Sequence, residues 1–199
     1  MQKLELSDLD MAVEVISQAF QNDPLCVYML PGEHSRLKTL RKFFHAYGMV
    51  YIKNGKGYGV GEPIKGVAFW MDPSSGDLSV SVKSLGVFIP VLFTSYSIGY
   101  LRARPILRET ELLHQKYASE PHYYLDNLAV MPADQGKGYS SQLMRPILEK
   151  ADAEKSIAYT DTVTRANVPL YEHFGFQVME ACAVGRTGIT VWALRREPR

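Results

Sequence analysis

Cysteine is scarce in this sequence, which holds only Cys26 and Cys182 among 199 residues. Two thiols cannot build the disulfide framework of a small secreted scaffold. Neither one has a histidine at a spacing typical of a metal site. We therefore expect two reduced core cysteines, no metal, and an intracellular, cytoplasmic protein.

A strong charge of one sign is missing as well. The 22 basic and 21 acidic residues leave a net charge of +1. So small a charge gives no long-range field that would attract nucleic acid or an anionic membrane. Residues 1–11 also lack the basic stretch and apolar run of a secretory signal. We expect neither nucleic acid nor a membrane as partner.

Long apolar runs are limited to residues 85–101, which carry no charged side chain. A membrane-spanning helix needs about 20 apolar residues, and this stretch is shorter. Pro90, Gly99 and the polar patch at 94–97 interrupt it further. We interpret it as buried helix, or as the wall of an apolar pocket, in a soluble protein.

The remaining pattern predicts one mixed domain over residues 1–199, because 46% hydrophobic residues suffice for a sizeable core. Apolar spacings of three and four residues predict five helices, at 8–21 (capped by Ser7), 34–51, 83–117, 139–153 and 167–174. Apolar runs bounded by turn residues predict seven strands, at 2–6, 55–61, 65–71, 123–131, 157–162, 176–184 and 189–195. Strands and helices alternate in the middle and hairpins flank them, which predicts a mixed α/β (α+β) fold rather than an all-parallel sheet.

The most informative feature is the turn 135–140, which joins the strand 123–131 directly to a helix. The first amides of a helix lack intrahelical partners, and its N-terminus carries about half a positive charge. Together they form an anion site that suits phosphate. Gly136 and Gly138 let phosphate approach without a Cβ in the way, and Lys137 either adds charge or extends into solvent. The alternative is a surface turn without a ligand.

Two common nucleotide motifs fit this turn poorly. A Walker-type loop needs a glycine five residues before Gly136 and Ser or Thr after Lys137, and neither is present. The dinucleotide fingerprint G-x-G-x-x-G has Ser141 in place of its third glycine, although Asp161 lies at about the distance of that motif's acidic residue. Pro132 and Gln135 also make the strand-to-helix connection longer than a Rossmann turn.

Two sequence blocks instead resemble the Gcn5-related N-acetyltransferase (GNAT) superfamily. Residues 135–140 (QGKGYS), preceded by 128–132 (LAVMP), are similar to its acetyl-CoA signature [R/Q]-x-x-G-x-[G/A], with Ser140 at the place of the final small residue. About thirty residues later, 167–176 (NVPLYEHFGF) are similar to its motif N-x-x-x-Y-x-x-x-G-F. The order and spacing of both blocks support the resemblance, which residues 74–119 match least.

The resemblance implies a central, mostly antiparallel sheet of 6–7 strands, splayed at a bulge in the strand 123–131 and flanked by helices. It implies an N-acetyltransferase that moves an acetyl group from acetyl-CoA to a primary amine, which we expect to belong to a small molecule because of the pocket residues described below. The cofactor-binding residues it points to are Leu128, Val130, Gln135, Gly136, Lys137, Gly138, Tyr139, Ser140 and Asn167. In the sequence itself, Tyr123 and Leu125 share one parity while Leu128 and Val130 share the other, which a β-bulge at 126–127 would produce.

Two residues are candidates for catalysis by direct attack of the amine. Tyr171 could protonate the leaving thiolate, or it could simply pack its ring against the sheet. Asp126 could take the amine's proton through a water, or it could hydrogen-bond the bulge amides. Asn167 lies four residues before Tyr171 and so on the same helix face, where it would contact the cofactor or cap the helix.

The acceptor is the least determined part. Residues 20–28 and 74–119 should form its pocket, and their apolar and aromatic side chains favour a small, partly apolar amine. The aromatic residues concerned are Tyr28, Phe88, Phe93, Tyr96 and Tyr100. The alternative function is a noncatalytic acyl-CoA-binding regulatory module, and a homodimer is possible in either case.

Overall fold

The computed structural model describes residues 1–74 and 95–199, with side chains described from residue 98 in the second range. A seven-stranded sheet in the order β1-β2-β3-β4-β5-β7-β6 forms its centre. The strands are β1 (Gln2–Lys3), β2 (Gly57–Val60), β3 (Gly66–Met71), β4 (Tyr123–Val130), β5 (Ala158–Thr162), β6 (Gln177–Ala183) and β7 (Thr190–Arg196). Neighbouring strands are antiparallel except β4 and β5. The predicted mixed, mostly antiparallel sheet is confirmed.

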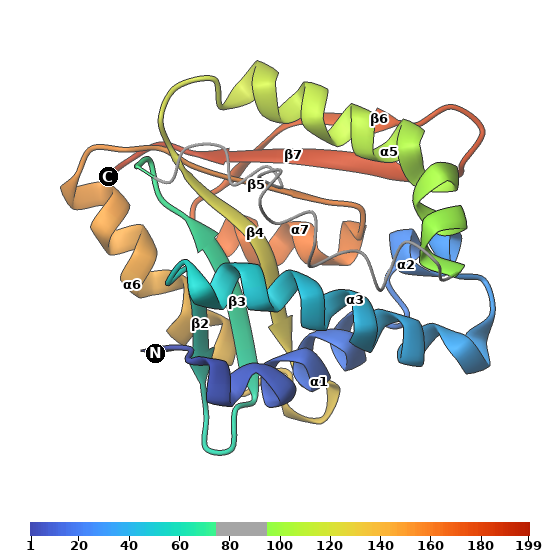
Figure 1. The fold of residues 1–199 in the computed structure, drawn as a ribbon. Coiled ribbons are helices and arrows are strands. Elements are labelled where there is room, and N and C mark those ends of the chain that lie inside the picture. Colours follow the sequence, from blue (N-terminus) through green and yellow to red (C-terminus); the bar gives the residue numbers. More distant parts are fainter. Residues whose placement is uncertain (75–94) are drawn as a thin grey trace.

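Helices cover both faces of the sheet (Figure 1). On one face, α1 (Leu9–Phe20) and α3 (Glu33–Lys53) pack on β2, β3 and β4, and α5 (Ser95–Tyr117) packs on β5, β6 and β7. On the other face lie α6 (Tyr139–Ala153) and α7 (Val168–His173). Each face of the sheet has its own hydrophobic core, and successive residues of β3 point into opposite cores. Phe69 packs under α1 and α3, whereas Trp70 packs with α6.

Two local details differ from the sequence prediction. The first helix is not capped by Ser7, because Glu5 and Asp8 form a capping box around the short 3-10 helix Leu6–Asp8 that precedes α1. A further helix, α2 (Pro24–Met29), follows where only a helix end was expected. The side chain of Asp23 accepts hydrogen bonds from two of its first amides, so the residues that ended one helix also begin the next.

The predicted bulge is present in β4. Phe69 pairs with Asn127 and Trp70 pairs with Leu125, so Asp126 is the extra residue. Leu125 packs with the α6 core and Ala129 with the α1 core, which confirms the change of parity.

β4 and β5 separate close to this bulge. They pair over three residues, ending at Leu125 and Thr160. Beyond that point β4 continues beside β3, whereas β5 runs on with β7 (Figure 1). We call the gap that opens here the fork. It corresponds to the splay that the resemblance implied.

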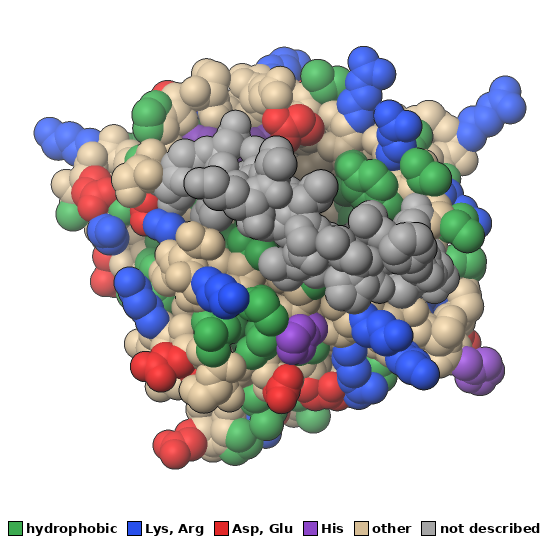
Figure 2. All heavy atoms as spheres, viewed as in Figure 1, with side chains coloured by type: hydrophobic (Ala, Val, Ile, Leu, Met, Phe, Trp, Pro, Cys, Tyr) green, Lys and Arg blue, Asp and Glu red, His purple; other side chains and the backbone are tan. Residues whose placement is uncertain are grey.

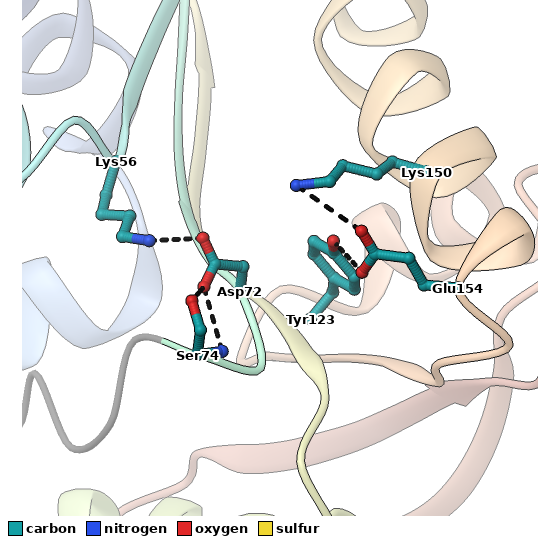
Figure 3. A network of polar contacts seen from close by, with 6 residues as sticks. All are labelled: Lys56, Asp72, Ser74, Tyr123, Lys150 and Glu154. Carbon is teal, nitrogen blue, oxygen red and sulfur yellow. Dashed lines mark hydrogen bonds and ion pairs between the residues drawn. The ribbon is translucent and has the colours of Figure 1, made fainter.

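Polar contacts hold the opposite end of the sheet. Asp72 accepts hydrogen bonds from Ser74 Oγ at 2.6 Å and from the Ser74 amide, and it pairs with Lys56 (Figure 3). Nearby, the hydroxyl of Tyr123 donates to Glu154 at 2.6 Å. These contacts fix the residues that precede 75–94.

The charged surface agrees with the small net charge, and the positions of the cysteines agree only in part with the expected core location. Figure 2 shows acidic and basic side chains interspersed over the face that carries α3. Cys26 is buried, as expected, but Cys182 lies half-exposed on the edge strand β6 and is no core residue. Both are free thiols. Within the described ranges, no helix combines the length and apolar character needed to cross a membrane.

Candidate functional site

A cavity of about 550 Å³ opens beside the fork. Its walls come from the loop after α1, the end of β4, the first turn of α6, and the segment from β5 to α7. Nine of the predicted cofactor-binding and catalytic residues meet there: Leu128, Val130, Gln135, Gly136, Gly138, Tyr139, Ser140, Asn167 and Tyr171. Lys137 and Asp126 are not among its lining residues.

The turn before α6 has the geometry of an anion cradle. Gly138 is the N-cap in a left-handed conformation (φ 82°), and no side chain caps the helix. The first intrahelical bond runs from the Gln142 amide to the Gly138 carbonyl at 3.2 Å, so the three preceding amides have no intrahelical partner. A Cβ added at Gly136 or Gly138 would meet no protein atom within 4 Å. The space before these amides is therefore open.

Lys137 does not add its charge to the cavity. Its Nζ lies 2.7 Å from Asp134, which also pairs with Lys65 at 3.6 Å. The sequence left two alternatives for Lys137, a charge beside the phosphate or a side chain that extends into solvent. The structure favours the second, because the side chain is 57% exposed and pairs with Asp134. Gln135 has a structural contact as well, since its Nε2 donates to the Val130 carbonyl at 3.4 Å and ties the turn to β4.

Tyr171 and Asn167 both face the cavity. Tyr171 is buried, with 6% of its surface exposed. Burial, followed by the charge of Asp161, raises the pKa of its phenol. The phenol therefore keeps its proton at neutral pH. Asn167 makes no capping hydrogen bond to α7, so its side chain is available to the cavity.

Asp126 lies at the fork but points to the α3 side. Its Oδ2 accepts hydrogen bonds from the hydroxyl of Tyr47 and, at 2.7 Å, from Asn127 Nδ2. Burial raises the pKa of this carboxyl, and the hydrogen bonds from Tyr47, Tyr51 and Asn127 oppose that rise. The donors come mainly from tyrosine side chains and not from the bulge amides that the sequence suggested as an alternative.

Two features of the site were not predicted. Asp23, which caps α2, also accepts a hydrogen bond from Thr164 Oγ1 at 2.9 Å and so joins the α1–α2 loop to the β5–α7 segment. Arg36 is buried and donates to the carbonyls of Gln21, Leu30 and Pro31 at 3.0, 2.6 and 3.2 Å. These contacts fix the loop that contributes Phe20 to Pro24 to the cavity. The only feature of the sequence that pointed to this loop was the Asp23-Pro24 pair at the end of the first predicted helix.

The predicted acceptor pocket is described in part. Phe20, Asn22, Asp23 and Pro24 line the cavity, as expected for residues 20–28. Tyr28 is half-buried against the α5 core, and Tyr100 is exposed to 49% on α5. Phe88, Phe93 and the side chain of Tyr96 lie outside the described residues, as does the portion 83–94 of the predicted helix. Within the described chain, no group of three or more potential ligands could hold a metal ion.

Comparisons with known proteins agree with this geometry. The profile of the acetyltransferase (GNAT) family matches residues 69–176, and the chain belongs to this family. It is thus an acyl-CoA-dependent acetyltransferase. An uncharacterized N-acetyltransferase of Schizosaccharomyces pombe is 28% identical over 98% of this chain and 82% of its own length.

Solved structures share the fold. A protein of Corynebacterium glutamicum described as histone acetyltransferase HPA2 and related acetyltransferase superposes with a TM-score of 0.65 at 20% identity, over 100% of this chain and 95% of its own. Arylalkylamine N-acetyltransferase 2 of Aedes aegypti superposes with a TM-score of 0.66 at 14% identity, over 100% and 98%.

Proposed function

We propose that this protein transfers an acetyl group from acetyl-CoA to the primary amine of a small molecule, by direct attack of the amine in a ternary complex. One observation carries the proposal. The uncapped N-terminus of α6, the edge of β4 beyond the fork and the buried phenol of Tyr171 all open onto one cavity. A phosphate site, a strand-like binding edge and a proton donor are thereby combined.

The residues present fit acetyl-CoA. The amides after Gly138 and the hydroxyl of Ser140 would hold its pyrophosphate, since phosphate binds well at an unpartnered helix N-terminus. Leu128 and Val130 lie on β4 where β5 no longer pairs with it, so their backbone groups would bind the pantetheine arm. Asn167 would contact the same arm. When bound, the cofactor supplies the thioester.

The chain's own groups then provide the chemistry. Backbone amides near the bulge can stabilise the oxyanion, a contribution of about 3 kcal/mol for one well-aimed donor. Tyr171 holds its proton until a thiolate forms, because burial raises its pKa. Neither cysteine lines the cavity, so the described residues offer no thiol there for an acyl-enzyme step.

A small, partly apolar acceptor is supported by the described wall of the cavity, where Ala19, Phe20 and Leu170 lie close to polar Asn22. One structurally similar protein is described as arylalkylamine N-acetyltransferase 2 of Aedes aegypti, and another as mosquito arylalkylamine N-acetyltransferase like 5b. We also propose that residues 1–199 form one domain, because strands from Gln2 to Arg196 belong to one sheet.

The test is amine-dependent release of coenzyme A. Acetyl-CoA is incubated with the protein and a panel of primary amines that includes 2-phenylethylamine, and free thiol is measured. We expect release that saturates with one of the amines. Tight binding of acetyl-CoA by calorimetry without release for any amine would favour the noncatalytic acyl-CoA-binding module instead.

A further inference from the structure

Two carboxylates lie at the fork, one on each strand, and the charge of Asp126 acts on Asp161. Leu125 and Thr160 are the last paired residues of β4 and β5, and the next residue on each strand is an aspartate, Asp126 and Asp161. Tyr124 lies between them, since its hydroxyl donates to Asp161 Oδ1 at 3.1 Å and its hydrogen bonding also acts on Asp126. The sequence favours Asp126 as the base and does not single out Asp161 for that role.

The two carboxylates differ in their hydrogen bonds. Asp126 receives donors from Tyr47 and Asn127, whereas Asp161 receives one, from Tyr124. A carboxylate offers about four acceptor positions, so Asp161 retains capacity for a ligand. Among the described residues neither aspartate forms an ion pair with a basic side chain. The site therefore has an excess of negative charge.

An independent feature on the same face points to a missing polar partner. Tyr159 lies two residues before Asp161 on β5, so both side chains leave the same face of the strand. It is fully buried, and its hydroxyl has no hydrogen-bond partner within the described chain. After burial, the charge of Asp161 is the largest influence that raises the pKa of Tyr159, which places this hydroxyl in the field of that carboxylate. Buried hydroxyls normally have partners.

We propose that the acceptor enters as an ammonium ion bound at Asp161, that Asp161 takes its proton, and that Asp126 is a fixed negative charge that tunes this base. The proposal rests on the proposed function and names the charge state of its substrate and the base. It assigns different tasks to the two aspartates according to how many donors already occupy each one. Asp161 acts as a catalytic residue and Asp126 as a positioning residue.

The electrostatics fit these roles. Burial, then the charge of Asp126, raises the pKa of Asp161 to about 7, and the hydrogen bond from Tyr124 opposes the rise. A general base works best with a pKa near the working pH. The titratable groups around this carboxyl come from every packed element: Tyr47 and Tyr51 on α3, Glu111 and His114 on α5, Tyr124 and Asp126 on β4, Tyr159 on β5, and Tyr171 on α7.

The protons balance. Asp161 takes one proton from the ammonium and becomes a neutral acid, which frees the nitrogen lone pair. As the nitrogen–carbon bond forms and the carbon–sulfur bond breaks, Tyr171 gives its phenol proton to the sulfur. Tyr171 regains a proton from the acylated nitrogen, and Asp161 releases its own to water. The products are an amide, a thiol and one proton.

The experiment measures kcat/KM against pH with 2-phenylethylamine, together with carbon NMR titration of labelled aspartate carboxyls in the protein alone. We expect a carboxyl that titrates near neutral pH, absent in Asp161→Asn, and a rate that falls below the same pH. Asp126→Asn removes a like charge and should move both to lower pH. Tyr124→Phe removes a donor to the carboxylate and should move both to higher pH.

Asp161→Asn should lower kcat/KM at pH 7.5 by about 100-fold, the lower end of the range for general-base catalysis. The loss should shrink as the pH approaches that at which the free amine is neutral, and Asp161→Glu should restore part of the rate. Asp10→Asn, an exposed carboxylate on α1, is the matched control and should change nothing. An Asp161→Asn enzyme that binds coenzyme A and keeps the wild-type rate overturns the proposal. An ordinary pKa for the Asp161 carboxyl in the NMR titration overturns it as well. No amine-dependent release by the wild type refutes the proposed function, whatever the titration gives.

Discussion

Replacing Gly138 by valine tests the phosphate cradle most directly. The backbone at this position has φ 82°, a region in which a β-branched residue is strained by about 1–3 kcal/mol. The added side chain meets no protein atom near its Cβ, so it occupies the open space before the α6 amides. Loss of two charge-assisted hydrogen bonds to phosphate, at about 1.5–3 kcal/mol each, corresponds to at least about 100-fold weaker binding of coenzyme A.

The chain offers a matched control in Gly188, which lies in the turn between β6 and β7. It also has a positive φ, 72°, and open space where a Cβ would lie. Gly188→Val should therefore cost similar stability, a decrease in Tm of about 2–4 °C for each kcal/mol, without any change in coenzyme A affinity.

Isothermal calorimetry with coenzyme A and thermal unfolding of both variants separate strain from binding. If folded Gly138→Val binds coenzyme A within about threefold of the wild type, the assignment of this turn to the pyrophosphate is wrong. Equal losses of affinity in the two variants would point to a general effect of backbone strain instead.

Three further predictions concern the same site and its support. Tyr171→Phe should lower kcat while the Kd for acetyl-CoA by calorimetry stays the same; an unchanged kcat at every pH would contradict the role of the phenol as acid. Arg36→Met leaves three carbonyl oxygens without their donor and should lower the free energy of unfolding in urea by about 3 kcal/mol. Arg41→Met removes an exposed ion pair and should lower it by less than about 1 kcal/mol. Equal effects of the two substitutions would show that the hydrogen bonds of Arg36 do not hold this loop in place. Hydrogen bonding with Arg196 lowers the pKa of Asp152 below 3.8, so the stability that Asp152 contributes is present above pH 4 and lost as the pH falls through its folded pKa. Melting curves of the wild type and Asp152→Asn should converge in acid, and a gap that does not narrow as the pH falls below 4 would contradict this.

The bulge in β4 and the anion cradle before α6 could be predicted because each depends on residues that are close together in the sequence. A change of parity between Leu125 and Leu128 has few causes in a strand that is buried on both sides, and a bulge is the simplest. Glycines between a strand and a helix likewise have a direct meaning for the backbone. Gly138 indeed has a positive φ and caps α6 without a side chain.

Long-range polar contacts could not be read in this way. Asp161 becomes notable only because β5 leaves β4 at Thr160, which places it opposite Asp126. Arg36 looked like one more charge on an amphipathic helix, and its three carbonyl partners lie between 5 and 15 residues away in the chain. No spacing rule links such a side chain to the backbone oxygens of residues 21, 30 and 31.

The short pairing between β4 and β5 has a thermodynamic consequence. Three residue pairs join strands β1–β4 to strands β5–β7 along this line. A ligand that contacts β4, α6 and α7 together would cross the seam and close it. By mass action, a ligand at one hundred times its Kd stabilises the folded state by about 2.7 kcal/mol. We therefore expect amide hydrogen exchange to slow most strongly in β4 and β5 when coenzyme A binds, because the seam is where the two parts of the sheet are joined least.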